Sequence, residues 1–149
     1  MNFQFDEGGL SRLLYTSHCA EEFTDRTRLD PGYIAEKAAR NNALRDITGS
    51  LLFVEDQFIQ ILEGPAAKVE ETFELICRDF RHHTLKLIDL VSVKERVFPE
   101  WSMACLVPDT ETRIRLRDEL DEIRFLLNVN ASQAVQQMRA LLHCELTRA

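Results

Sequence analysis

Two polar residues that could bind a ligand through hydrogen bonds lie inside apolar segments of the chain. Tyr15 lies in residues 10–18, LSRLLYTSH, and Gln60 lies in residues 47–64, ITGSLLFVEDQFIQILEG. A phenol can give up a proton, and a primary amide both donates and accepts hydrogen bonds. A buried amide without a partner costs about 1–3 kcal/mol. Gln60 therefore predicts a bond to the local backbone or to a ligand, and Tyr15 predicts either a packed core ring or a functional hydroxyl.

Two adjacent amides, Asn41 and Asn42, form a second candidate. The preceding segment opens with Asp30-Pro31, which is typical of an N-cap followed by proline in the first helical turn. The apolar stripe of this predicted helix runs through Ile34 and continues to the two asparagines. Asparagine also commonly ends helices. The pair therefore indicates either a helix end or a polar contact to a ligand.

The elements around these residues follow from apolar periodicity. Strands are predicted at 10–18, 85–93 and 101–107, and a hairpin at 47–64 with its turn at 55–56. Helices are predicted at 31–42 and 65–79, and residues 81–83 are expected in a loop. This order, β-α-β-β-α-β-β, indicates an α+β, ferredoxin-like fold: a five-stranded sheet with two flanking helices.

The C-terminal residues predict a helical pair. Two apolar stripes lie on either side of a break at 128–130; they consist of Leu116, Leu120, Ile123 and Leu127, and of Val135, Met138, Leu141 and Leu142. The stripes could pack on the free face of the sheet, on each other, or on another subunit. We expect residues 1–108 to form the main domain and residues 109–149 to form a helical cap of that domain, because about forty residues make too small a core to fold alone.

Composition excludes several classes of protein. A net charge of −7 argues against binding to nucleic acid or to an anionic membrane. No apolar run is long enough to span a bilayer, and the N-terminus lacks a signal peptide, so we expect a cytoplasmic protein. The four cysteines have no metal-binding or disulfide spacing and are expected to be reduced and mostly packed, and the adjacent histidines His82 and His83 make no metal motif. No catalytic motif is present, so an enzyme is not expected.

Five separated segments resemble one family, the BLUF domains, which sense blue light with a flavin. In chain order these segments are RLLYTS, RNNALRDITGSLLF, QFIQILEGP, DFRHH and FPEWSM. They cover about residues 10–107 and follow the strand and helix order predicted above. The resemblance implies that a flavin lies between the two helices that flank the sheet. The implied cofactor is FAD, with FMN or riboflavin accommodated in some members.

The resemblance also implies roles for single residues. Tyr15 matches the redox-active tyrosine of the family, and Gln60 matches the glutamine between that tyrosine and the flavin. Asn42 matches the asparagine that binds the polar edge of the ring, and Asn41 falls where members carry Asn or His beside the flavin. Trp101 and Met103 match a pair on the fifth strand that passes the signal outward.

One loop and one departure complete the comparison with the family. Asp79, Arg81 and His82 fall in a loop that contacts the flavin in some members. Leu75 stands where some members carry an arginine near the flavin, so that contact is not expected here.

The implied function is that of a photoreceptor without turnover. Light would drive electron and proton transfer from Tyr15 through Gln60, and the rearranged amide would signal through the fifth strand and the terminal helices. The expected partners are a downstream signalling protein and further copies of the chain. Two alternatives remain: an interaction module without photochemistry, which would show no reversible spectral shift, and a redox flavoenzyme using Cys19 or Cys105, which would turn over NAD(P)H.

Overall fold

A mixed β-sheet forms the centre of the molecule. The computed structural model describes residues 9–19, 46–54, 57–78, 82–105 and 115–146 of the 149. The strands are β1 (Leu10–Cys19), β2 (Thr48–Val54), β3 (Gln57–Pro65), β4 (His82–Val93) and β5 (Trp101–Cys105). They lie in the order β4-β1-β3-β2-β5. The β4–β1, β1–β3 and β3–β2 pairs are antiparallel, whereas β5 runs parallel to β2.

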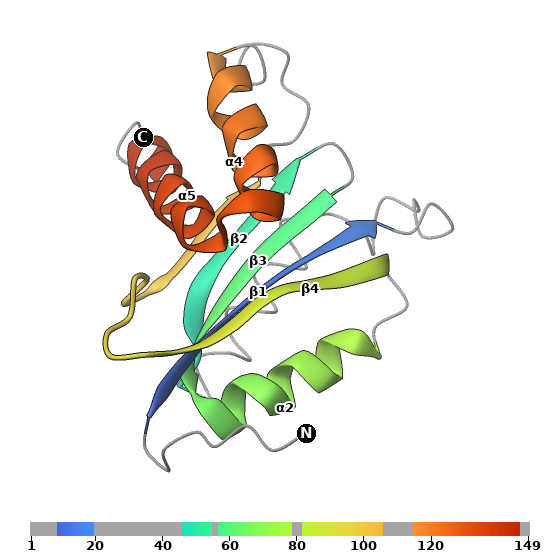
Figure 1. The fold of residues 1–149 in the computed structure, drawn as a ribbon, viewed down its shortest axis with the longest axis vertical. Coiled ribbons are helices and arrows are strands. Elements are labelled where there is room, and N and C mark those ends of the chain that lie inside the picture. Colours follow the sequence, from blue (N-terminus) through green and yellow to red (C-terminus); the bar gives the residue numbers. More distant parts are fainter. Residues whose placement is uncertain (1–8, 20–45, 55–56, 79–81, 106–114, 147–149) are drawn as a thin grey trace.

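Three helices cover the sheet in the described part of the chain. They are α2 (Ala66–Cys77), α4 (Arg117–Val129) and α5 (Ala131–Leu146). Figure 1 shows α2 on one face of the sheet, and α4 and α5 together on the other. The predicted α+β class is therefore confirmed. The helix predicted at 31–42 lies outside the described residues.

Helix boundaries follow from single residues. α2 begins directly after Pro65, which ends β3 and occupies the N-cap position of the helix; proline suits this place because it has no N–H to satisfy. Asn130 adopts an extended conformation and ends α4. Its Oδ1 accepts the N–H of Gln133 at 3.2 Å, so the same residue caps α5. These two boundaries set where the covering helices leave the sheet.

The middle strand β3 is buried on both faces, as predicted. Every residue from Phe58 to Gly64 is buried. Its close approach to β2 needs Gly49, whose φ is +149° and whose added Cβ would lie 1.9 Å from the carbonyl oxygen of Ile61. Only glycine adopts this backbone without strain. Strand β3 is thus held tightly between β1 and β2.

Alternate residues of the strands feed two separate apolar clusters. The smaller cluster lies under α2 and contains Leu13, Tyr15, Ile47, Leu62 and Val69. The larger cluster joins strand residues to both terminal helices and contains Leu14, Leu52, Ile59, Ile61, Phe98, Leu116, Leu120, Ile123, Leu127, Ala134, Val135, Met138, Leu141 and Leu142. The two predicted apolar stripes are therefore buried against the sheet and against each other.

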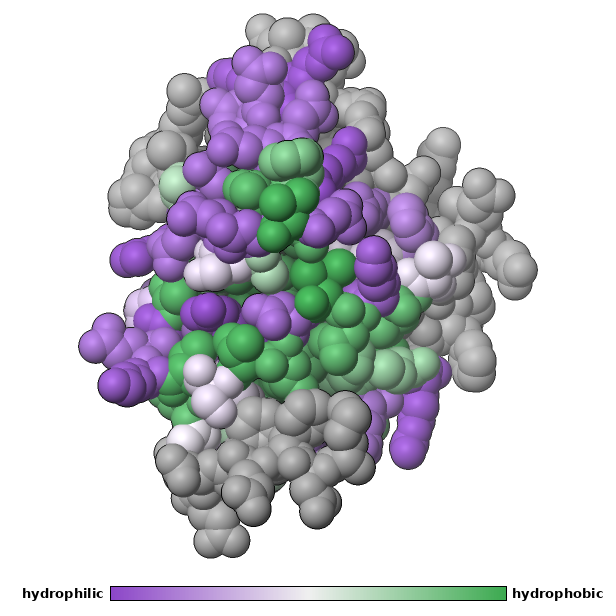
Figure 2. Space-filling model, viewed as in Figure 1, coloured by the Kyte–Doolittle hydropathy of each residue, from purple (hydrophilic) through white to green (hydrophobic). Residues whose placement is uncertain are grey.

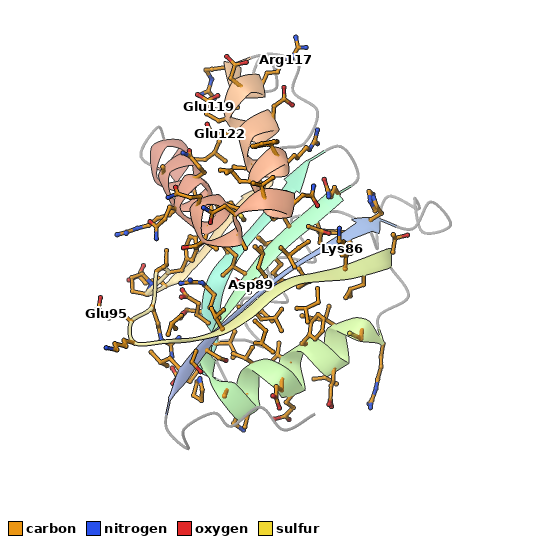
Figure 3. The ribbon with its side chains drawn as sticks, viewed as in Figure 1. Lys86, Asp89, Glu95, Arg117, Glu119 and Glu122 are labelled. Atoms are coloured by element: carbon orange, nitrogen blue, oxygen red, sulfur yellow. The ribbon has the colours of Figure 1, made fainter. Side chains whose placement is uncertain are left out.

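The surface follows the same division. Figure 2 shows hydrophilic residues over α4 and a more apolar band across the middle of the face in view. On α4, Arg117, Glu119 and Glu122 lie on the side away from the sheet (Figure 3). Among the described residues, no helix is both long enough and apolar enough to cross a membrane.

Two predictions about local structure are wrong. Residues His82 and His83 belong to β4, not to a loop. The β1–β4 register shifts next to Thr84, whose φ is +53°. A bulge of this kind adds one residue to β4, so the pairing with β1 continues to His82. The extra residue breaks the period-two pattern in the sequence, which is why the predicted strand begins later. The second error concerns the helix predicted at 65–79, whose apolar spacing predicts a buried stripe through Val69, Phe73, Ile76 and Cys77. Cys77 is exposed, whereas Thr72 is buried.

Candidate functional site

Tyr15 and Gln60 lie directly opposite each other on β1 and β3. Directly opposed residues of an antiparallel pair share one face of the sheet, and here that face is the one covered by α2. Each side chain is 4% exposed. The hydroxyl of Tyr15 donates a hydrogen bond to Oε1 of Gln60. The structure therefore brings together the two residues that the sequence singled out first.

The surroundings of Tyr15 fix the position of its ring. The ring of Phe73, on α2, lies with its centroid 5.6 Å away at an interplanar angle of 53°, a tilted arrangement typical of stabilising aromatic pairs. The β1–β4 pairing shifts register between Leu14 and Tyr15 and again between Thr16 and His18. Such bulges bend a strand and re-aim its side chains, and they are frequent beside active sites. Apolar periodicity carries no signal for them, so the sequence did not predict them.

The Gln60 amide retains hydrogen-bonding capacity for a ligand. Among the described residues, its one hydrogen bond is the bond that Oε1 accepts from Tyr15. Its two N–H groups can therefore donate to a further acceptor, such as a bound ligand. Such a bond would remove the free-energy cost of leaving a buried donor unpaired. A flavin presents carbonyl and ring-nitrogen acceptors, so this donor set fits a flavin edge.

A backbone row joins this pair to the last strand. Gln60 lies opposite Leu51 of β2, and Leu51 in turn lies opposite Met103 of β5. Trp101 lies opposite Gly49 two residues earlier. The side chains of Trp101 and Met103 lie outside the described part of the structure. The described backbone nevertheless places Met103 in the same cross-strand row as Tyr15 and Gln60.

The remaining predicted flavin contacts divide into two groups. Asn41, Asn42, Asp79 and Arg81 lie outside the described residues, and His82 is described only as the first residue of β4. Leu75, which replaces the arginine of some family members, is 44% exposed on α2. An exposed leucine supplies no polar contact at this point of α2.

A buried carboxylate beside this site was not predicted. Glu63 of β3 is fully buried, and its oxygens accept the backbone N–H groups of Val97 and Phe98. The signal was present in the sequence, because ILEGP places an acid in a strand that is otherwise apolar. A charge on a strand buried on both faces requires partners from another element.

Comparison with known proteins identifies the family. The family model described as sensors of blue light using FAD, BLUF, matches residues 10–104. This chain belongs to the BLUF family. The matched region contains Tyr15, Gln60 and the five strands, and the family is one of light sensors, so this region is a flavin-using sensor domain and not a catalytic one.

Relatives within the BLUF family differ in what accompanies the sensor. The chain is 37% identical over 95 residues to a photoactivated adenylate cyclase subunit beta of Euglena gracilis, and the match covers 63% of this chain and 11% of that protein. It is 29% identical over 132 residues to the blue light- and temperature-regulated antirepressor BluF of Escherichia coli K12, covering 89% of this chain and 31% of the relative. The chain thus spans only a small part of these relatives.

A solved BLUF protein matches over nearly its whole length. The dark-state structure of BlrB superposes with a TM-score of 0.68 at 28% identity, covering 90% of this chain and 95% of that one. The match therefore extends beyond residues 10–104.

Proposed function

We propose that Tyr15 and Gln60 carry the light response of this BLUF protein. The observation that supports the proposal is the buried hydrogen bond between them on the α2 face. When bound, the flavin supplies absorption of blue light and the capacity to accept an electron. Tyr15 gives up an electron and its hydroxyl proton, and Gln60 passes the proton on because its amide both accepts and donates. After the electron and the proton have both returned to Tyr15, Gln60 would hold a new hydrogen-bonded arrangement.

Residues of this chain would also hold the cofactor. Gln60 would donate from its amide, and Asn42 and Asn41 would bind the polar edge of the ring. Asp79 and Arg81, before β4, and His82, at its first position, would contact the remainder. The proposed cofactor is FAD, as in the description of the family. Chromatography of the flavin released by heating would separate FAD from FMN and riboflavin.

The rearranged amide is proposed to act on a partner through β5 and the terminal helices. The row from Gln60 through Leu51 to Met103 supports a route to β5. The relatives named above include a cyclase subunit and an antirepressor, so the proposed partner is a separate effector protein or an effector in the same chain. A change of a few kcal/mol in the free-energy difference between two arrangements suffices for such a switch.

The helical pair is proposed to be part of the same folding unit as the sheet. Residues from α4 and α5 share one apolar cluster with Leu14, Leu52 and Ile61. Residues 109–149 would then act as a cap of the domain formed by residues 1–108. Thermal unfolding of the whole chain should show one cooperative transition.

The decisive experiment is illumination of the purified, flavin-loaded protein. A reversible red shift of the flavin absorption in blue light, with a lowered infrared stretch of a flavin carbonyl, is expected if Gln60 adds a hydrogen bond. Absence of any reversible shift would contradict the proposal and would favour an interaction module without photochemistry. Sustained consumption of NAD(P)H would favour a redox enzyme.

A further inference from the structure

A buried carboxylate ties the centre of the sheet to the connection that precedes β5. Oε1 of Glu63 accepts the N–H of Phe98 at 2.6 Å, and Oε2 accepts the N–H of Val97 at 2.9 Å. Arg12, which lies directly opposite Glu63 on β1, brings its guanidinium to 3.7 Å from Oε2. Both carboxylate oxygens are thus satisfied, as a fully buried charge requires.

Arg96 fastens the same connection from the other side. Its guanidinium donates to Thr48 Oγ1 at 2.7 Å, to the carbonyl of Glu63 at 3.1 Å and to the carbonyl of Asp46 at 3.1 Å. Its second nitrogen lies 3.3 Å from the Asp46 carboxylate. We refer to Glu63, Arg96, Val97 and Phe98 as the Glu63 clamp. It joins residues 96–98 to β3 and to the start of β2.

The Glu63 side chain and Phe98 lie on the face of the sheet opposite to Gln60. Gln60 and Glu63 are three residues apart on β3, so their side chains point to opposite faces. Gln60 lies on the α2 face with Tyr15, whereas Glu63 lies on the face covered by α4 and α5. Phe98, which Glu63 holds, is buried in the larger cluster among residues of both helices. Glu95, which precedes the clamp, marks the β4–β5 connection in Figure 3.

We propose that Glu63 is a positioning residue for the light response: it couples movement of β3 at Gln60 to Phe98, and through Phe98 to α4, α5 and the start of β5. This inference rests on the proposed function of Gln60. A close-packed strand cannot shift at one residue without moving its neighbours. The two hydrogen bonds from Glu63 make the connection follow β3 instead of sliding past it.

The test is the substitution Glu63→Gln in the full-length, flavin-loaded protein. A carboxylate accepts at both oxygens, but an amide accepts at one and presents N–H₂ at the other, which here would face a backbone N–H. We expect amide exchange at Val97 and Phe98 in the dark to rise about 10-fold or more, as expected when a buried hydrogen bond is lost. We also expect the flavin red shift to keep its amplitude, because Gln60 is unchanged.

The decisive readout is the light-induced change in amide exchange across α4 and α5. It should fall to less than about half of its value in the unsubstituted protein, which a merely structural role of Glu63 would not produce. The matched control is Glu71→Gln, the same substitution at an exposed carboxylate on α2 that lies 3.9 Å from Lys68. This control should leave both the dark exchange and the light-induced change unaltered.

Two results would overturn the assignment. In the first, Glu63→Gln loses protection from amide exchange at Phe98 but still shows the full light-induced change in exchange across α4 and α5. In the second, amide exchange at Val97 and Phe98 in the dark is the same in Glu63→Gln as in the unsubstituted protein. If Glu63→Gln does not fold, Arg96→Lys tests the same connection at its other anchor, because one ammonium group cannot serve the acceptors on Thr48, Glu63 and Asp46 together. It should likewise lower the light-induced change in α4 and α5, and a full change there would count against the clamp. Absence of a red shift in the unsubstituted protein would overturn the proposed function as well, whereas an intact red shift with an intact helix response overturns only the role of Glu63.

Discussion

On the α2 face of the sheet, two polar side chains bonded to each other, Tyr15 and Gln60, interrupt a small apolar cluster. On the opposite face, a larger and almost wholly apolar cluster joins the same strands to α4 and α5. Burial of apolar area stabilises the fold without directional demands, whereas a buried polar pair specifies one arrangement and can be exchanged for another. The comparison fits the proposal made above, in which one face supplies most of the stability and the other carries the light response.

The substitution Gln60→Leu should remove the response from the α2 face altogether. Leucine has a similar volume and keeps the pocket apolar, so flavin should still bind. It offers neither donor nor acceptor, and the reversible red shift and the lowered flavin carbonyl stretch should both be absent. A light-minus-dark spectrum in the visible and infrared checks this. The matched control is Ile61→Val on the same strand but the opposite face, which should keep the red shift and lose about 0.5–1.5 kcal/mol of stability.

Tyr15→Phe should abolish the stable photoproduct while flavin remains bound. Phenylalanine keeps the ring packing against Phe73 but lacks the hydroxyl that donates to Gln60. Loss of that donor leaves a buried carbonyl oxygen unpaired, at a cost of about 1–3 kcal/mol. Flash illumination followed by absorption spectroscopy tests the photoproduct, and Tyr33→Phe, at the other tyrosine of the chain, is the control. A normal difference spectrum from Tyr15→Phe would end the assignment of Tyr15.

Met138→Ala tests the opposite face. Met138 is fully buried on α5 within the larger cluster, so the substitution should cost about 2–5 kcal/mol through lost contacts and a cavity. Denaturant unfolding measures this cost, and Met138→Leu, which nearly conserves volume, should restore most of it. The position of the flavin red shift should not move. A variant that kept its stability but lost the red shift would reverse the division between the two faces.

Asn42→Ala should weaken flavin binding by about 1–3 kcal/mol, through loss of one hydrogen bond to a buried ligand edge. The stability of the flavin-free protein should change less than the flavin affinity, which fluorescence titration can measure. Asn128→Ala, on α4 and over the other face, removes an asparagine that bonds Lys86 at 3.4 Å and should leave flavin affinity unchanged. Equal flavin affinity in Asn42→Ala and the unsubstituted protein would show that Asn42 only ends a helix.

Residue patterning predicted the larger features of both faces. Period-two alternation in residues 10–18 puts Leu13 and Tyr15 on one face and Leu14 on the other, and the two clusters have them so. The four-three-four spacing in the tail predicted one apolar stripe from Leu116 to Leu127, but left open whether it packs on the sheet, on the other helix or on another subunit. The β4 boundary was missed because the irregularity at Thr84 depends on pairing with β1, which the local sequence does not encode. The Glu63 clamp was missed because its partners, Val97 and Phe98, are more than thirty residues away and contribute backbone N–H groups, which every non-proline residue carries. The direct pairing of Tyr15 with Gln60 depends on the β1–β3 register, which periodicity does not give; the family resemblance implied only that the two residues are neighbours.

The smallest expected effect concerns Cys77, the last residue of α2. Although Cys77 is exposed as a residue, partial burial of its sulfur, and then the charge of Glu74 on the preceding turn, raise the pKa of the thiol above its ordinary value. A raised pKa lowers the thiolate fraction at neutral pH, so Cys77 should react with iodoacetamide more slowly than an unperturbed thiol, and the difference should vanish once the pH exceeds both pKa values.

Glu74→Gln removes the smaller of the two causes and should speed the reaction roughly twofold, as expected for one exposed charge. Peptide mass spectrometry after timed alkylation measures the rate at Cys77 separately from the other cysteines, and Glu119→Gln on α4 is the control, since it neutralises a carboxylate on the opposite side of the sheet. If Glu119→Gln speeds alkylation as much as Glu74→Gln does, the effect comes from net charge and not from the local environment at the end of α2.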